Sequence, residues 1–324
     1  MSLLNKWVLI FVQKGCENVE PRILSSSSWI TEENINYSLN VMRFNILWNQ
    51  GYTGEGMVVG VVDSGIDYNH PMFGNRIIEG YNFSNDGNPA DDIFDYNYHG
   101  TAVTSLISGK YMDYRRYGVA PDSKIIVAKS MNASGKGSLT AIANGINYCV
   151  EKNVDVINCS VGSADNATVL ENAVRNAVAK GIPVVVASGN DGHNDTNGSI
   201  REISYPASYD DAICVGAMDK EFNITGFSNS NEFVDFVAPG KQILTAYPSN
   251  KYALCEGTSF ACPLVSGILL LLKQKFIDDF RRLPNEAELY GMLMRYTREL
   301  QGVSRYMQGH GYIDCSINRK RRNK

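Results

Sequence analysis

Short apolar runs rich in branched residues alternate with stretches of helical spacing along most of the chain after residue 56. The apolar runs lie between turn signals and predict buried strands at Met57–Val62, Lys124–Lys129, Val154–Ser160, Pro183–Ala187 and Ala212–Ala217. Helical spacing predicts helices at Leu139–Lys152 and Thr168–Lys180. This alternation is typical of βαβ units. It predicts an α/β three-layer sandwich, in which a mostly parallel, doubly wound sheet has helices on both faces.

The first 45 residues interrupt this pattern. The run Ser25–Ser28 and the polar stretch Thr31–Asn36 separate two short apolar segments. Because so short a segment is unable to bury a core of its own, we expect residues 1–45 to be an extension of one large domain over 46–316. The end of the chain, 317–324, is rich in lysine and arginine and predicts a solvated basic tail.

Composition limits the partners. Of 324 residues, 44% are hydrophobic, and 30 basic against 34 acidic side chains leave a net charge of −4, which argues against nucleic acid or an anionic membrane as the main partner. The apolar run Trp7–Val12 is too short for a signal peptide, and Phe260–Leu272 falls short of the roughly 20 residues of a membrane span. The residues do not indicate an oligomeric state.

The seven cysteines are odd in number and several lie inside apolar strand or helix patterns, at positions 16, 149, 159, 214, 255, 262 and 315. This distribution favours free buried thiols in a reducing cytosol over a framework of disulfides. None has the spacing of a metal ligand, so we expect no metal among the catalytic groups.

A candidate nucleophile, Ser259, stands between a glycine turn and the apolar run that begins at Phe260. A serine hydroxyl is a weak nucleophile unless a histidine takes its proton and a carboxylate orients that histidine. Asp63 ends the first predicted strand, and His99 opens a short apolar stretch of helical character. A lone histidine is more often structural, and Asp67 is a rival acid in a more loop-like position.

Five segments together resemble, in order, the signature segments of the subtilisin family, over roughly Leu47 to Asp314: Asp63-Ser64-Gly65, His99-Gly100-Thr101, Gly118-Val119-Ala120-Pro121, Ser188-Gly189-Asn190 and Gly257-Thr258-Ser259. The Asn-rich approach to the histidine and Ser204-Tyr205-Pro206-Ala207 are most similar to the intracellular bacterial members. The resemblance implies a subtilisin-like fold and a serine endopeptidase that forms an acyl-enzyme.

The resemblance also implies a role for each catalytic residue. Ser259 would attack, His99 would transfer the proton and Asp63 would orient the histidine. Asn190 would donate a side-chain N–H to the oxyanion beside the backbone N–H of Ser259. The alternative for Asn190 is a turn residue, because Asn-Asp-Gly is a turn sequence in its own right.

Two further segments align with the family's substrate-binding strands, Gly135-Lys136-Gly137 and Ser160-Val161-Gly162. They would hold protein or peptide substrates in extended form by main-chain hydrogen bonds. By position, Asp191 and Ser204 would line the pocket for the residue before the cut. A carboxylate there would favour basic or polar residues, although a solvated acid at the rim is the ordinary case.

No cofactor is implied for the chemistry. Met72 stands where many subtilisins carry an aspartate that binds calcium, and the matching loop Lys110–Arg116 has two arginines, so we expect the strong calcium site to be absent. The oxygen-rich stretch Asp191–Asn197 could hold a weaker structural calcium ion, or be merely solvated.

The biological role stays open between general turnover of cytoplasmic protein and dedicated removal of a leader or propeptide from one precursor. A catalytically silent peptide-binding module is the alternative of another class, although the chain keeps every triad residue. A lipase-like hydrolase is disfavoured, because it requires Gly-x-Ser-x-Gly and position 261 is alanine.

Two hypotheses concern regulation. The N-terminal extension could lie across the cleft as a removable inhibitor, as in intracellular subtilisins, or simply pack on the body. Cys262 follows Ser259 by three residues on the same helical face, where a helix N-terminus lowers a thiol's pKa and would make it reactive. The alternative is a small buried apolar residue.

Overall fold

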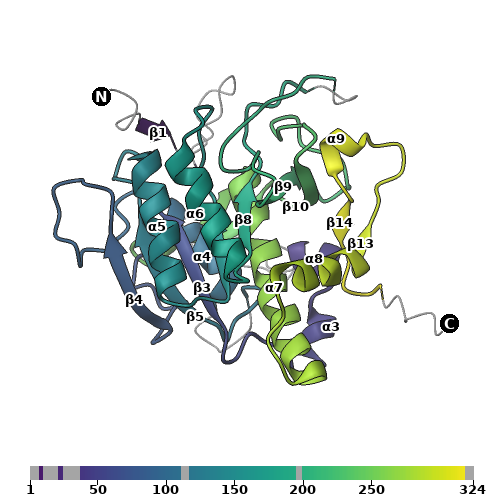
Figure 1. Cartoon of the computed structure of the whole chain (residues 1–324), viewed down its shortest axis with the longest axis horizontal. Helices are drawn as coiled ribbons and strands as arrows, with labels where there is room; N and C mark the ends of the chain where they lie inside the picture. Colours follow the sequence, from purple (N-terminus) through teal and green to yellow (C-terminus); the bar gives the residue numbers. More distant parts are fainter. Residues whose placement is uncertain (1–6, 10–20, 25–36, 111–116, 195–198, 318–324) are drawn as a thin grey trace.

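A nine-stranded sheet forms the centre of the fold in the computed structural model, which describes residues 7–9, 21–24, 37–110, 117–194 and 199–317 (Figure 1). In spatial order its strands are β13 (Thr297–Arg298), β14 (Tyr312–Ile313), β10 (Val234–Pro239), β9 (Ile213–Met218), β8 (Val184–Ala187), β7 (Val156–Cys159), β3 (Val58–Asp63), β5 (Lys124–Lys129) and β4 (Ile77–Asn82). Neighbouring strands run parallel except β13 and β14. The predicted mostly parallel sheet is therefore confirmed.

Helices cover both faces of this sheet. On one face α4 (His99–Ser108) packs against α7 (Thr258–Phe280), and on the other α5 (Leu139–Glu151) packs against α6 (Thr168–Ala179) (Figure 1). Alternate residues of β3 point to opposite layers: Val61 belongs to the apolar cluster of α4 and α7, and Val62 to that of α5 and α6. Burial on both faces explains why these strands are continuously apolar in sequence.

The structure makes α7 longer than the sequence predicts. It runs for 23 residues and is long and apolar enough by composition to cross a membrane, but 83% of its most apolar 18-residue window is buried inside the fold. The apolar run Phe260–Leu272 is only part of this helix, which continues through Lys273 to Phe280. The buried ammonium of Lys273 forms an ion pair with the half-buried Asp155 at 2.9 Å. This helix is the central core helix of the molecule.

The remaining described elements surround the sheet. A three-stranded antiparallel sheet joins β11 (Ile243–Tyr247), β12 (Lys251–Cys255) and β2 (Arg22–Leu24), and a two-stranded one joins β1 (Trp7–Leu9) to β6 (Lys136–Ser138). Short helices are α2 (Tyr37–Met42), α3 (Asn45–Trp48), α8 (Glu286–Arg295) and α9 (Arg305–Gln308). Both strands of the N-terminal segment thus pair with the body.

The strand order reverses beside β3. The chain passes from β3 to β5 on one side and only later to β7 on the other. In open α/β sheets, ligands bind beyond the carboxyl ends of the strands at such a switch point. Asp63, Ser160 and Asn190 lie at or just beyond the carboxyl ends of β3, β7 and β8.

Candidate active site

A buried Asp–His pair lies at the switch point. His99 Nδ1 is 2.8 Å from Asp63 Oδ1, and the two side chains are 4% and 1% exposed. Because a carboxylate oxygen accepts, Nδ1 carries the proton in this pair, and Nε2 is left as the basic nitrogen. The amide of Ser64 donates to the same Asp63 oxygen at 2.7 Å. The carboxylate therefore fixes both the orientation and the tautomer of the imidazole.

The rival acid Asp67 and the nearby His70 bind other groups and, within the described residues, form no hydrogen bond with the Asp63–His99 pair. The carboxylate of Asp67 accepts the amides of Asn69 at 3.0 Å and Ser249 at 2.8 Å, which is a loop-stabilising role. The ring of His70 lies within hydrogen-bonding distance of the Lys251 carbonyl.

Ser259 sits in the first turn of α7, where the first backbone N–H groups of a helix lack intrahelical partners. Its hydroxyl donates to the carbonyl of Ser160 at 3.1 Å, and the Ser160 hydroxyl donates back to the Ser259 carbonyl at 3.0 Å. The ring of Phe260, the next residue, lies 5.5 Å from the His99 ring, centroid to centroid. The ring of His99 thus lies against the residue that follows Ser259 at the start of α7.

Asn190 is held with its amide in one orientation. Its Oδ1 accepts the backbone N–H of Thr258 at 2.9 Å and the Thr258 hydroxyl at 3.0 Å. The Nδ2 end lies beside Gly257, where an added Cβ would come within 3.2 Å of it. The donor end of the amide therefore lies beside the turn that precedes Ser259. Sequence analysis did not single out Thr258, although its place within Gly-Thr-Ser is a signal for it.

The first predicted substrate segment, Gly135-Lys136-Gly137, forms a turn and the strand β6. A Cβ on Gly137 would lie 2.2 Å from the carbonyl oxygen of Ser130, so this close approach requires glycine. One edge of β6 pairs antiparallel with β1, with Val8 opposite Gly137. An extended segment therefore already occupies this edge.

The second segment, Ser160-Val161-Gly162, continues β7 and is buried. Ser163, directly after it, forms an antiparallel bridge with Tyr205. Ser204 is thereby brought alongside, with its buried hydroxyl 3.4 Å from the Ser163 carbonyl.

Asp191 is half-buried next to Asn190. Its amide donates to Asn229 Oδ1 at 2.6 Å, and the amide of Asn229 donates to the Gly189 carbonyl at 3.1 Å. The side chain and the backbone amide of Asn229 thus hold the turn from Gly189 to Asp191 in place.

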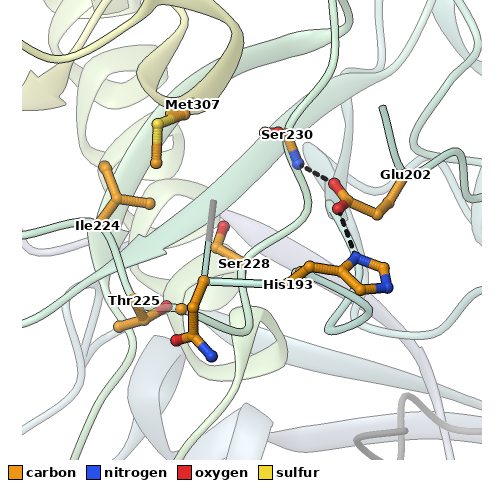
Figure 2. A pocket seen from close by; sticks show the side chains of 10 residues that line it. His193, Glu202, Ile224, Thr225, Ser228, Ser230 and Met307 are labelled. Carbon is orange, nitrogen blue, oxygen red and sulfur yellow. Dashed lines mark hydrogen bonds and ion pairs between the residues drawn. The ribbon is translucent and has the colours of Figure 1, made fainter. Parts of the chain in front are cut away.

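A small pocket of about 160 Å³ lies beyond this turn, between the Gly192–Asn194 segment and 224–230. Figure 2 shows that both oxygens of Glu202 are engaged there, one by the His193 ring at 2.9 Å and one by the Ser230 amide at 2.9 Å. Within the described residues no group of three or more His, Cys, Asp or Glu side chains is arranged to hold a metal ion. The rest of the predicted weak calcium loop, 195–197, lies outside the described residues.

At Met72, where many subtilisins carry a calcium-binding aspartate, the neighbouring carbonyl groups bind a cationic side chain of the chain itself. Met72 is fully buried, and the buried guanidinium of Arg76 donates to the backbone carbonyls of Met72, Phe73 and Pro121. Burial lowers the pKa of Arg76 to about 10. Carbonyl oxygens that accept from a guanidinium are not available to Ca²⁺, so these residues do not fit the ion. Residues 111–116 of the predicted loop lie outside the described residues.

The reactive-thiol hypothesis for Cys262 is wrong. Its side chain is 0% exposed and lies 3.3 Å from Asn158 Oδ1. Burial raises the pKa of the thiol well above its usual range, because desolvation of the thiolate outweighs the helix N-terminus. The alternative, a small buried residue, describes Cys262.

Comparison with known proteins agrees with this geometry. The model of the subtilase family matches residues 54–311. The chain is 39% identical over 277 residues to the major intracellular serine protease of Bacillus subtilis (strain 168), covering 85% of this chain and 86% of that protein. It is 41% identical over 268 residues to an intracellular serine protease of Paenibacillus polymyxa (82% and 81%), and 35% identical over 248 residues to subtilisin DY of Bacillus licheniformis (75% and 86%). The chain therefore belongs to the subtilase family and is a serine endopeptidase.

Proposed function

We propose that Asp63, His99 and Ser259 form the catalytic triad of this endopeptidase. The Ser259 hydroxyl turns from the Ser160 carbonyl to His99 Nε2 when a substrate binds, which is a rotation about one side-chain bond. His99 takes the proton as Ser259 attacks the scissile carbonyl and then gives it to the leaving amine. Water then attacks the acyl-enzyme, and His99 takes a proton from the water and returns it to the Ser259 oxygen. Asp63 holds Nδ1–H throughout and stabilises the imidazolium.

The observation that carries this proposal is the buried 2.8 Å contact between His99 and Asp63 beside the first turn of α7. Asn190 Nδ2 and the Ser259 amide supply the oxyanion donors, because Thr258 already holds the other end of the Asn190 amide. Ser259→Ala tests the assignment. In subtilisin, loss of the nucleophile lowers kcat about 10⁶-fold, and we expect a loss of that order. A variant with a tenth of wild-type turnover would exclude Ser259 as the nucleophile.

The substrate-binding strands are proposed on their placement. Gly135-Lys136-Gly137 presents an edge that pairs antiparallel with an extended segment. Ser160-Val161-Gly162 follows β7 directly, and its first residue supplies the carbonyl that accepts the Ser259 hydroxyl. Asp191 and Ser204 then border the pocket for the residue before the cut. A protein chain bound in extended form between the two segments suits broad specificity.

The N-terminal extension, residues 1–45, is proposed as a removable inhibitor of the domain 46–316. β1 occupies the same edge of β6 that a substrate would use. β2 pairs with β12, the strand that leads to Gly257 and Ser259. A segment bound at both places competes with substrate until it is displaced or cut. The tail 317–324 stays a prediction, since 318–324 lie outside the described residues.

General turnover of cytoplasmic protein is the proposed biological role. Two relatives that match most of the chain are named intracellular serine proteases. The test is digestion of a cytosolic proteome with the cut sites mapped by mass spectrometry. Cuts in many proteins with a loose residue preference support turnover, whereas cuts in one precursor would identify a dedicated processing protease.

A further inference from the structure

Asp95 lies in the loop before α4 and has no part in the triad, yet its carboxylate gathers five donors at 1% exposure. Its Oδ1 accepts from the Ser64 hydroxyl at 2.9 Å, the Asn97 amide at 3.0 Å and the Tyr98 amide at 2.9 Å. Its Oδ2 accepts from the Thr101 amide at 2.8 Å and the Thr101 hydroxyl at 2.6 Å. One donor follows the catalytic acid at the end of β3, and the others lie before or within the first turn of α4, which contains His99.

At the N-terminus of α4, Asp95 caps the helix, because its carboxylate accepts backbone amides at the start of the helix. α4 begins after Tyr98, which makes no side-chain cap hydrogen bond, and His99 is the first helical residue. The Asp95 carboxylate accepts the amides of Tyr98 and Thr101, so it binds the backbone on each side of His99. A negative charge at a helix N-terminus is also favoured by the helix dipole.

On the strand side, Asp95 reaches the end of β3 through Ser64. The Ser64 hydroxyl donates to Asp95 and accepts the Gly100 amide at 2.9 Å, while the Ser64 amide binds Asp63 Oδ1 at 2.7 Å. One carboxylate therefore connects the residue after the catalytic acid with the residue after the catalytic base.

The N-terminus of α4 packs closely against the backbone that follows β3. A Cβ on Gly100 would lie 2.2 Å from the Gly65 carbonyl oxygen, so the first turn of α4 rests directly on the backbone that follows β3. Tyr98 has φ +130°, a conformation that a residue with a side chain adopts only when its surroundings hold it there. The hydrogen bond from the Tyr98 amide to Asp95 is part of that restraint.

We propose that Asp95 is a positioning residue of the reaction, which sets the distance and angle between Asp63 and His99 by tying Ser64 to the N-terminus of α4. This inference rests on the proposed triad. An amide in place of the carboxylate breaks the tie, because Nδ2 is a donor and would face the two donors of Thr101.

The test compares full-length wild type with Asp95→Asn and Asp67→Asn. Asp67 is the matched control, since it is equally buried and accepts backbone amides, but its carboxylate binds Asn69 and Ser249 rather than α4. For Asp95→Asn we expect kcat to fall about 10- to 100-fold with KM within about twofold, as for a small misplacement of catalytic groups. We also expect the downfield proton resonance of His99 Nδ1–H to move upfield. For Asp67→Asn we expect the kcat and the His99 resonance of the wild type.

Three results decide the matter. An Asp95→Asn enzyme with the kcat and His99 resonance of wild type overturns the proposal, and so does an equal loss in both variants. If Asp95→Asn does not fold, Ser64→Ala replaces it, and a roughly threefold or larger loss of kcat with the resonance shifted supports the proposal, whereas no change overturns it. Labelling of wild-type Ser259 by a fluorophosphonate is measured first. Its failure would refute the proposed triad itself, apart from any effect of Asp95.

Discussion

At the scale of single residues, the amide proposed to bind the oxyanion is held in place before any substrate binds. The backbone N–H and the hydroxyl of Thr258 both donate to the oxygen of the Asn190 amide, so the nitrogen faces the turn that precedes Ser259. Thr258 also accepts the Gly189 amide at 3.2 Å, which joins the two turns. A donor fixed in this way needs no reorganisation during the reaction, and most of its value is realised in the transition state.

Asn190→Ala is therefore expected to lower kcat about 10²- to 10³-fold while KM changes little. Thr258→Val keeps the donor but removes the hydroxyl that holds it, and we expect a smaller loss, about tenfold. Steady-state kinetics on a chromogenic peptide measure both. An Asn190→Ala enzyme within threefold of wild type would return Asn190 to the role of a turn residue.

Asp235 gives the folded protein a dependence on pH. Burial raises its pKa to about 6, although the Tyr290 hydroxyl and the Cys214 amide donate to it at 2.6 and 2.8 Å. A carboxyl whose folded pKa lies above its unfolded value binds a proton more tightly when folded. Its stabilising contribution is present below about pH 4 and is lost as the pH rises through about 6.

Urea unfolding at pH 4.5 and pH 7.5 tests this in the Ser259→Ala background, which prevents self-digestion. We expect Asp235→Asn to lose less stability than its parent over this interval, by on the order of 2 kcal/mol. A parallel pH dependence in the two proteins would show that Asp235 titrates normally.

At the scale of elements, five of the strands buried on both faces were predictable, whereas the buried strand β10 and the edge strands were not predicted. β3, β5, β7, β8 and β9 lie within two residues of their predicted bounds, because a parallel strand between two helical layers is apolar at nearly every position. β4 was missed because it is an edge strand with exposed positions at Ile78 and Tyr81. β13 and β14 have two residues each, too few to make a pattern.

The candidate site divides in the same way. The triad candidates, Asn190 and the two substrate segments could be proposed from the sequence because each residue lies in a short contiguous motif. Asp95 and Thr258 act through hydrogen bonds to residues that only the fold brings together, so their function leaves little trace in the local sequence. The two readings of Cys262 stayed open because helix position is visible in the sequence, whereas complete burial is not.

The strand β1 supplies the prediction that belongs to this scale. Deletion of residues 1–9 removes the segment that pairs with β6 and leaves β2 in place. We expect kcat/KM for an extended peptide to rise about tenfold or more, since an occupied cleft lowers the fraction of molecules able to bind. Val8→Pro, at the centre of the pairing, should have the same direction of effect.

Equal kcat/KM for the full-length and the deleted protein, with no self-trimming of the longer form, would mean that the extension only packs on the body. The comparison needs early time points, because an active enzyme that removes its own extension converges on the deleted form.

At the scale of the whole molecule, a cationic side chain of the protein joins two distant turns near Met72, the residue that stands where many subtilisins carry a calcium-binding aspartate. The Arg76 guanidinium joins the turn at Met72 and Phe73 to the Pro121 carbonyl across the fold. Lys110 pairs with Asp122 beside it, at about one-third exposure. A covalently attached cation is not removed by a chelator.

We therefore expect excess chelator to shift the Tm of the Ser259→Ala protein by less than about 2 °C. Arg76→Met removes the guanidinium donor of the buried Pro121 carbonyl, whereas the Met72 and Phe73 carbonyls keep the backbone amides of Lys110 and Arg76. This substitution should cost on the order of 2 kcal/mol, whereas Lys110→Met breaks a surface pair and should cost less than about 1 kcal/mol. Thermal unfolding with and without chelator measures all three. A large drop in Tm on chelation would reveal a structural ion that Arg76 does not replace.

The most direct test of the central claim is to map the site at which a fluorophosphonate reacts. Only a serine activated by a base attacks this reagent readily. We expect one adduct, on the peptide that contains Ser259, formed at a rate that falls at least about 10³-fold in His99→Ala. An adduct on another serine, or an unchanged rate of labelling without His99, would contradict the Asp63–His99–Ser259 triad.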